Sequence, residues 1–230
     1  MNKSVVITGA SRGFGYALYN QFISHEWNVI PIVRKGKDAQ TLKIIGGKFC
    51  FPIIADITEN NVLNSINASL KSFKTIDLLI NNAGIGGNSI LLNDTSPDEI
   101  LSLFNVHCLG VLRVSQSVLP LMKRSGIVIN VSSRFGSISK TSKGELDDLS
   151  CSYAYRIAKS AQNMLTQCMC REYINSGLKI CSIHPGRLKT DIASMDADKT
   201  PDEAAKILYK RLFNFEHGKF YNLFGEEMEW

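Results

Sequence analysis

The sequence predicts an α/β protein in which helices cover both faces of a doubly wound parallel sheet, folded as one three-layer domain across residues 1–230. Short runs of β-branched residues alternate along the chain with longer amphipathic stretches. Runs that are apolar on both faces are typical of strands in a buried parallel sheet. The 230 residues suffice for one such domain, and no Pro-, Gly- or Ser-rich tract is long enough to link two domains.

Each expected element follows from its local pattern. Strands are predicted at short runs rich in Val and Ile, at residues 4–9, 28–34, 49–56, 76–84, 126–133, 179–186 and 219–225. Helices are predicted at the amphipathic stretches, at residues 14–26, 60–73, 97–122, 153–169 and 201–213. Together they indicate a Rossmann-type fold. The polar, turn-rich residues 137–152 are least regular, and we interpret them either as a solvated loop or as the rim of an active site.

Composition excludes several classes of function. The formal net charge is +5, and Lys and Arg form no run of five or more, so a nucleic-acid partner is not expected. The apolar stretch near the start covers only residues 5–7, too short for a signal peptide or membrane span, so we expect a cytoplasmic protein without a membrane partner. The cysteines show no Cys-xx-Cys pair and no His at metal-ligand spacing, so we expect reduced thiols and no metal site.

A glycine-rich turn follows the first predicted strand and opens the first predicted helix. A strand, turn and helix in this order lets backbone N–H groups at the helix N-terminus bind a pyrophosphate. The spacing is Gly-xxx-Gly-x-Gly, which differs from the commoner Gly-x-Gly-xx-Gly. The candidate cofactor-binding residues of this turn are Gly9, Ser11, Arg12, Gly13, Phe14 and Gly15.

Basic residues occupy the position, at the end of the second predicted strand, where NAD-binding sequences carry an acidic residue. In NAD sites a carboxylate at the end of the second strand binds the ribose 2′-hydroxyl. Here that position holds Arg34 and Lys35, and Arg12 lies within the glycine turn. Because cations suit a 2′-phosphate, the sequence predicts NADP(H) as the cofactor.

Tyr155 and Lys159 lie four residues apart in a predicted helix, so their side chains project from one face. A free phenol has a pKa of about 10. A neighbouring ammonium favours the phenolate, and we expect it to bring that pKa toward neutrality, as a general acid or base requires. Tyr153 has Ile157 at the same spacing and lacks the cation.

The chain resembles the short-chain dehydrogenase/reductase family over essentially its whole length, because several of that family's motifs occur in order. These are TGASRGFG at 8–15, Asp56 after the third strand, NNAG at 81–84, Ser132-Ser133, Tyr155-xxx-Lys159, and PGRLKT at 185–190. The stretch YAYRIAKSAQNMLT, the HPG turn and the GEEMEW segment resemble the small carbonyl-reductase branch. The TGASRGFG string is also similar to that of sepiapterin reductases.

The resemblance implies a role for each matching residue. Tyr155 protonates the substrate carbonyl oxygen or deprotonates the alcohol, Lys159 lowers its pKa and binds the nicotinamide ribose, and Ser133 polarises the same oxygen. The implied cofactor contacts are Asp56 with the adenine, Asn82, Ala83 and Gly84 on the adenosine side, Leu188 and Thr190 at the nicotinamide end, and Pro185 and Gly186 beside them. The hydride chemistry belongs to the cofactor.

Two features depart from the family pattern. The family usually has a proton-relaying Asn in the helix before the fifth strand; here His107 aligns there, and Asn105 lies two residues earlier. An imidazole can relay protons, so His107 is a catalytic candidate, while a packed histidine and a substitute role for Asn105 stay open. Tyr155 follows Ser133 by 22 residues, a longer separation than in many relatives. We expect this insertion to lie at the substrate mouth, with Phe135 and residues 139–151 as its walls.

These observations predict an NADP(H)-dependent oxidoreductase that reduces a ketone or aldehyde, or oxidises the matching alcohol. The alternative is a cofactor-binding regulatory protein of the same fold with little turnover, which the His107 substitution permits. A nucleotide-sugar epimerase is disfavoured because only 40 residues follow Thr190. Relatives often pair through helices equivalent to residues 110–122 and 155–173, so we expect a homodimer or homotetramer.

Overall fold

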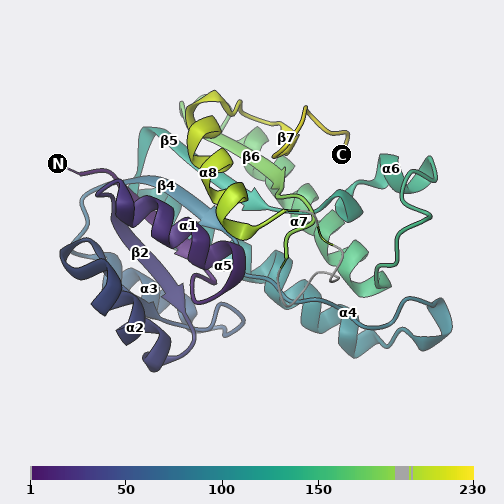
Figure 1. Ribbon diagram of the computed structural model, residues 1–230, viewed down its shortest axis with the longest axis horizontal. Helices are drawn as coiled ribbons and strands as arrows, with labels where there is room; N and C mark the ends of the chain where they lie inside the picture. The colour runs from purple at the N-terminus through teal and green to yellow at the C-terminus, as the bar shows by residue number, and fades with distance from the viewer. Residues whose placement is uncertain (1, 190–196, 198) are drawn as a thin grey trace.

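The computed structural model describes residues 2–189, 197 and 199–230, which form a seven-stranded sheet with helices on both faces (Figure 1). The strands are β1 (Ser4–Thr8), β2 (Asn28–Val33), β3 (Ile53–Ile54), β4 (Ile76–Asn81), β5 (Met122–Val131), β6 (Lys179–His184) and β7 (Phe220–Asn222). Their order is β3-β2-β1-β4-β5-β6-β7, and every neighbouring pair is parallel. The predicted doubly wound parallel sheet is confirmed.

The helices form two layers. They are α1 (Gly13–Ser24), α2 (Gly36–Gly46), α3 (Val62–Leu70), α4 (Pro97–Phe104), α5 (Gly110–Val118), α6 (Ile138–Ser142), α7 (Tyr153–Glu172) and α8 (Pro201–Arg211). Buried residues of α1, α2 and α8 share one apolar core, and those of α3, α5 and α7 share another on the opposite face. None of the helices in the described part of the chain is long and apolar enough to cross a membrane.

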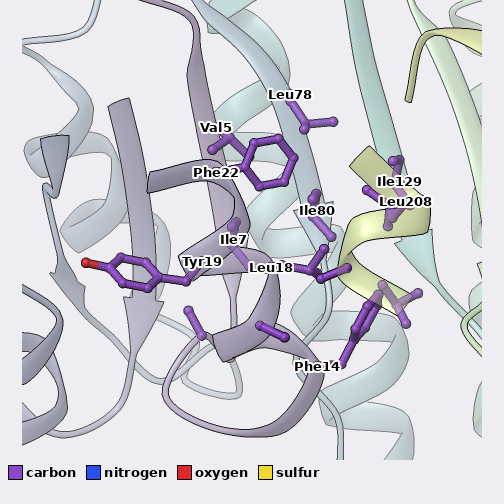
Figure 2. Packing of buried hydrophobic residues seen from close by; sticks show 14 of the residues in the cluster. Val5, Ile7, Phe14, Leu18, Tyr19, Phe22, Leu78, Ile80, Ile129 and Leu208 are labelled. Atoms are coloured by element: carbon purple, nitrogen blue, oxygen red, sulfur yellow. The ribbon is translucent and has the colours of Figure 1, made fainter. Parts of the chain in front are cut away.

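Side chains that alternate along a strand pack into both apolar cores. On β1, Val5 and Ile7 pack into the core beneath α1 and α8, while Val6 packs into the core of the other face, as expected for side chains that alternate along a strand. Figure 2 shows Phe22 of α1 and Leu208 of α8 pointing into the first core. Full burial of such side chains contributes about 1.5–3 kcal/mol each.

The strand order creates the place for a ligand. The chain leaves β1 toward β2 and β3, then crosses to β4 and continues toward the opposite edge. Ligands of open α/β sheets bind outside the carboxyl ends of the strands at this reversal, here between β1 and β4. The glycine turn follows β1, and Asn82 to Gly84 follow β4.

Three local predictions need correction. Helix α2 was not predicted, although Ala39 and Leu42 give it a buried face and Lys43 lies in its last turn. The single helix expected at 97–122 is interrupted by a π-helical turn, η3 (Asn105–Leu109), and its end belongs to β5. The irregular 137–152 segment contains the short helix α6.

Candidate active site

The glycine turn has a backbone that requires glycine. Gly9 and Gly13 have φ values of 67° and 54°, in the left-handed region that other residues rarely adopt. A Cβ on Gly15 would approach the Gly9 carbonyl oxygen to 2.2 Å. The first turn of α1 has no acidic residue, and its N-cap, Arg12, makes no side-chain capping bond. The N–H groups at this helix start are therefore suited to an anion.

A cleft of about 470 Å³ runs along the carboxyl ends of the strands from this turn to α7. The predicted residues that line it are Gly9, Ser11, Arg12, Gly13, Phe14, Gly15, Arg34, Asp56, Asn82, Ala83, Gly84, His107, Tyr155, Lys159, Pro185, Gly186 and Leu188. Ser133 borders the cleft without lining it, and Thr190 lies outside the described residues. The structure thus brings these predicted residues from many separate segments into one site, whereas Phe135 and residues 139–151, expected as walls of the substrate mouth, are not among its lining residues.

Asp56 and Arg34 both line the cleft and lie close enough for their charges to interact. The Asp56 carboxylate accepts hydrogen bonds from the backbone N–H of Thr58 at 2.9 Å and from its hydroxyl at 2.7 Å. Burial raises the pKa of Asp56, but these hydrogen bonds and the Arg34 charge outweigh it and leave the pKa below its ordinary value. Asp56 is therefore an anionic acceptor beside a cation at neutral pH.

Asn82 joins the ends of β1 and β4. Its amide nitrogen donates to the carbonyl oxygens of Thr8 at 3.0 Å and Gly9 at 3.3 Å. The backbone N–H groups of Asn82 and Ala83 both donate to the Thr8 hydroxyl at 2.9 Å. Asn82 thus holds the glycine turn in shape while it also lines the cleft.

Tyr155 and Lys159 face the cleft from the first turns of α7, as the spacing predicts. The Ser152 hydroxyl caps this helix by accepting from the Tyr155 backbone N–H at 3.1 Å. Lys159 is 3% exposed, and its Nζ donates to the carbonyl oxygen of Val131 at 2.7 Å and to Gln162 Oε1 at 2.9 Å. Nζ lies 5.7 Å from the centre of the Tyr155 ring.

The expected lowering of the Tyr155 pKa is wrong for this structure. Burial raises the pKa of Tyr155 to about 12, against the opposing effect of a hydrogen bond with Ser133. Burial also lowers the pKa of Lys159 to about 7. Burial disfavours the charged form of each group, which is the phenolate of Tyr155 and the ammonium of Lys159. The phenol is protonated at neutral pH, and Lys159 titrates near neutrality.

His107 occupies the centre of the site. The π-helical turn carries it to 1% exposure, with its ring nearly perpendicular to the Tyr155 ring and 5.4 Å from it. Its Nε2 lies 2.8 Å from the carbonyl oxygen of Ile85. Burial and then the Lys159 charge place the pKa of His107 well below its ordinary value, so the ring is neutral. Nε2 donates to the Ile85 carbonyl oxygen in one tautomer and accepts from the Ile85 backbone N–H, 3.3 Å away, in the other, while Nδ1 has no hydrogen-bond partner among the described residues.

The Asn105 side chain makes hydrogen bonds away from Tyr155. Its amide nitrogen donates to the carbonyl oxygen of Thr58 at 3.2 Å, and its amide oxygen accepts from Arg113 at 2.8 Å. These bonds tie the π-helical turn to the loop that carries Asp56. This engagement favours His107 over Asn105 as the residue beside Tyr155.

The model of the short chain dehydrogenase family matches residues 3–201. The chain belongs to the short-chain dehydrogenase family. This short-chain dehydrogenase is 32% identical over 197 residues to "Oxidoreductase BOA17" of Botryotinia fuckeliana (strain B05.10), an alignment covering 84% of this chain and 68% of the relative. It is 31% identical over 160 residues to "C-signal" of Myxococcus xanthus, covering 67% of this chain and 93% of that protein.

Solved structures share the fold over the whole length of this dehydrogenase. The NADPH-bound carbonyl reductase from chicken fatty liver superposes with a TM-score of 0.86 and 29% identity, covering 100% of this chain and 99% of the other. The carbonyl reductase Sniffer of D. melanogaster superposes with a TM-score of 0.89 at 22% identity, covering 100% of both chains. The second likeness concerns the fold alone.

Several lining residues of this short-chain dehydrogenase escaped sequence reasoning. They are Ile32, Val33, Ala55, Ile57, Thr58, Ile85, Val106 and Val131, while Ser132 and Lys189 were named within motifs but given no role. Most flank a predicted residue and share its strand end or loop, so adjacency was the available signal. Among the described residues, no group of three or more His, Cys, Asp or Glu side chains is arranged to hold a metal ion.

Proposed function

We propose that this short-chain dehydrogenase is an NADP(H)-dependent carbonyl reductase that uses Tyr155 as its general acid. The observation that carries the proposal is the convergence of Ser133, Tyr155 and Lys159 at one end of a cleft whose other end holds the glycine turn and Arg34. The superposed chicken structure, an NADPH-bound carbonyl reductase, supports the same assignment.

The cleft residues fit a dinucleotide phosphate. The left-handed Gly9 and Gly13 let the backbone approach a pyrophosphate at the start of α1. Arg12 and Arg34 both line the cleft and can meet a 2′-phosphate, with Asp56 beside them for the adenosine. Pro185 and Gly186 also line the cleft, as Tyr155 does. When bound there, the reduced nicotinamide supplies the hydride.

The protonation states suit reduction. With a pKa of about 12, Tyr155 keeps its proton at neutral pH and can donate it to a carbonyl oxygen. Ser133, hydrogen-bonded with Tyr155, can donate to the same oxygen. The protonated Lys159 stabilises the phenolate left behind, and its pKa of about 7 makes that support available at and below neutrality. The neutral His107, whose Nδ1 has no hydrogen-bond partner among the described residues, extends the polar path behind the phenol.

The test is NADPH oxidation, followed by absorbance, against ketones, aldehydes and 1,2-diketones for the wild type and Tyr155→Phe. We expect turnover by the wild type, and a loss of roughly 100-fold or more in Tyr155→Phe with NADPH binding retained. Full activity in Tyr155→Phe contradicts the assignment of the acid.

A binding protein with little turnover is the second candidate, and His107 is the observation that favours it. The buried imidazole fills a position where the family usually has a smaller amide. If the wild type binds NADPH but turns over no carbonyl, while His107→Asn gains turnover, the regulatory function is favoured. Measurable turnover by the wild type, with equal or lower turnover in His107→Asn, supports the enzyme.

We also propose that the protein pairs with a second copy through α7 and α4. Tyr153, Ile157 and Met164 expose an apolar stripe along α7, and Leu101 is 63% exposed on α4, which packs beside it. A charged residue introduced into this stripe should oppose pairing, because it would be buried at the interface. Light scattering should show a dimer or tetramer for the wild type and a monomer for Met164→Lys; a monomeric wild type refutes the proposal.

A further inference from the structure

Gln162 lies on α7 three residues after Lys159 and is completely buried, with 0% of its surface exposed. Glutamine is seldom enclosed to this degree, because both ends of its amide need hydrogen-bond partners. Its Oε1 accepts a hydrogen bond from Lys159 Nζ at 2.9 Å. Its Nε2 has no hydrogen-bond partner among the described residues. A buried donor without a partner destabilises a fold, so the Gln162 amide serves the ammonium of Lys159 and not the packing of the core.

A separate group of buried polar side chains lies one turn further along α7. The Thr166 hydroxyl donates to the backbone oxygen of Gln162 at 2.9 Å, and it accepts from Asn130 at 2.9 Å and from Ser182 at 3.1 Å. Among the described residues, no hydrogen bond joins this group to the Gln162 amide. These side chains therefore bind α7 to β5 and β6 without involving the Gln162 side chain.

The Lys159 ammonium is held by two neutral acceptors. Its Nζ donates to the Val131 carbonyl oxygen at 2.7 Å and to Gln162 Oε1 at 2.9 Å. An ammonium has three N–H donors, so one remains for a group in the cleft that Lys159 lines. Within the described part of the chain, no carboxylate pairs with Lys159.

The other titratable groups around Lys159 carry no negative charge at neutral pH. Burial raises the pKa of Tyr155 to about 12 and that of Cys151, which lies near it, to about 11. Burial, with smaller effects of nearby positive charges, lowers the pKa of His184 on β6 to about 3 and that of His107 on η3 well below its ordinary value. Both phenol and thiol therefore keep their protons, and both imidazoles are neutral.

Charged groups on the remaining elements packed against α7 also leave the ammonium without a counter-ion. Arg134, in the turn that packs on α7, adds a second positive charge beside His184. Glu99 of α4 directs its carboxylate to the backbone N–H groups of residues 88 and 89. The Gln162 amide oxygen is therefore the side-chain acceptor that supports the Lys159 charge.

We propose that Gln162 is a positioning residue for carbonyl reduction, because its amide oxygen holds the Lys159 side chain at the cleft and favours the ammonium form. This inference rests on the proposed reductase function, in which that charge stabilises the phenolate of Tyr155 after proton donation. A hydrogen bond made to the charged form of a group favours that form. Such bonds are stronger than those between neutral groups. Gln162 thereby opposes the burial that lowers the pKa of Lys159 to about 7.

Two substitutions at this position change the acceptor in opposite directions. Gln162→Leu keeps a side chain of similar size and removes the acceptor, whereas Gln162→Glu keeps the shape and adds a negative charge. Thr166→Val is the matched control, since Thr166 is a fully buried, hydrogen-bonded residue of the same helix that does not contact Lys159.

The charge of Lys159 is measured in two ways on the full-length protein. An NMR titration of the lysine side chains, without cofactor or substrate, gives its pKa directly, and Lys159→Arg identifies the signal. The pH dependence of kcat/KM for NADPH-dependent carbonyl reduction gives the pH above which activity falls. Circular dichroism shows whether each variant is folded.

We expect Gln162→Leu to lower the midpoint of the Lys159 titration by about one pH unit, because it removes a hydrogen bond to a charged group. Gln162→Glu should raise the midpoint, since an anion favours the ammonium more than an amide does. The fall in kcat/KM moves in the same direction in each variant, so Gln162→Leu loses activity about tenfold near pH 8. Thr166→Val is less stable but keeps the wild-type midpoint in both measurements.

The proposal is overturned if the two Gln162 variants shift the Lys159 midpoint in the same direction, if neither shifts it, or if Thr166→Val shifts it as Gln162→Leu does. Shifts in the NMR titration without matching shifts in the kinetic profile also overturn it. Failure of the proposed function is distinguishable, because the NMR titration needs no turnover. A wild type that reduces no carbonyl compound refutes the reductase, and the titration then decides by itself whether Gln162 sets the charge of Lys159.

Discussion

Replacing Gly136 by alanine should push Ser133, the proposed catalytic serine, away from α7. Gly136 ends the short 3-10 turn η5 (Arg134–Gly136), which follows Ser133 and packs directly on α7. A Cβ built on Gly136 lies 2.8 Å from the Lys159 carbonyl carbon and 2.9 Å from both its Cβ and its oxygen. These distances are about 0.6 Å short of an ordinary 3.4 Å contact, and the neighbouring atoms belong to the backbone of a long helix. The turn must therefore move, because the helix cannot.

The size of the effect follows from that displacement. Overpacking of this kind costs about 1–3 kcal/mol, which lowers Tm by roughly 2–12 °C in a chain of this length. Since a 1 Å misplacement at an active site can cost about 100-fold in rate, a shift of 0.6 Å should lower kcat roughly tenfold. Calorimetry and NADPH-oxidation assays measure both. Gly36→Ala is the control, because its Cβ meets only Ile54 Cδ1, at 3.7 Å. A wild-type Tm and kcat in Gly136→Ala would refute the reasoning.

Three further results are expected. Arg34→Ala should weaken NADPH binding by about 10- to 100-fold and leave NADH binding nearly unchanged, since it removes a charge-assisted bond to the 2′-phosphate; equal losses for both cofactors, measured by fluorescence titration, contradict this role. The wild-type kcat/KM for reduction should fall as pH rises above about 7, where Lys159 loses its proton, while Tyr155 with its pKa of about 12 stays protonated; residual activity of Lys159→Arg should lack that fall, and an identical profile argues against Lys159 as the titrating group. Phe22→Ala should lower the free energy of unfolding by about 3–5 kcal/mol in urea denaturation, because Phe22 is fully buried; a loss below 1 kcal/mol shows that the core collapses around the gap.

Local sequence signals were sufficient where one residue type is physically required. The glycine turn was predictable because positive φ at Gly9 and Gly13 leaves little choice of residue. The common face of Tyr155 and Lys159 was predictable because helix periodicity alone decides it. The strands were predictable because both of their faces are buried, which produces short continuous runs of Val and Ile.

Local sequence signals did not predict the features that packing between distant segments determines. The π-helical turn at Asn105–Leu109 has no distinct composition, yet it carries His107 into the site and Asn105 away from it. Helix α2 was missed because its apolar face is narrow, with Ala39 and Leu42 as the buried side chains of its middle. The contact of Glu229 with Lys143 joins residues 86 positions apart, which no periodic pattern indicates.

The sequence by itself determined the family, the doubly wound sheet and many of the residues around the cleft, because motif order and strand hydrophobicity are properties of the chain. Only the tertiary structure decided the protonation states. From spacing, the Lys159 charge was expected to lower the pKa of Tyr155, yet burial raises the pKa of Tyr155 to about 12 and lowers that of Lys159 to about 7. Desolvation depends on how completely the surrounding elements exclude water, and that is known only once those elements are packed.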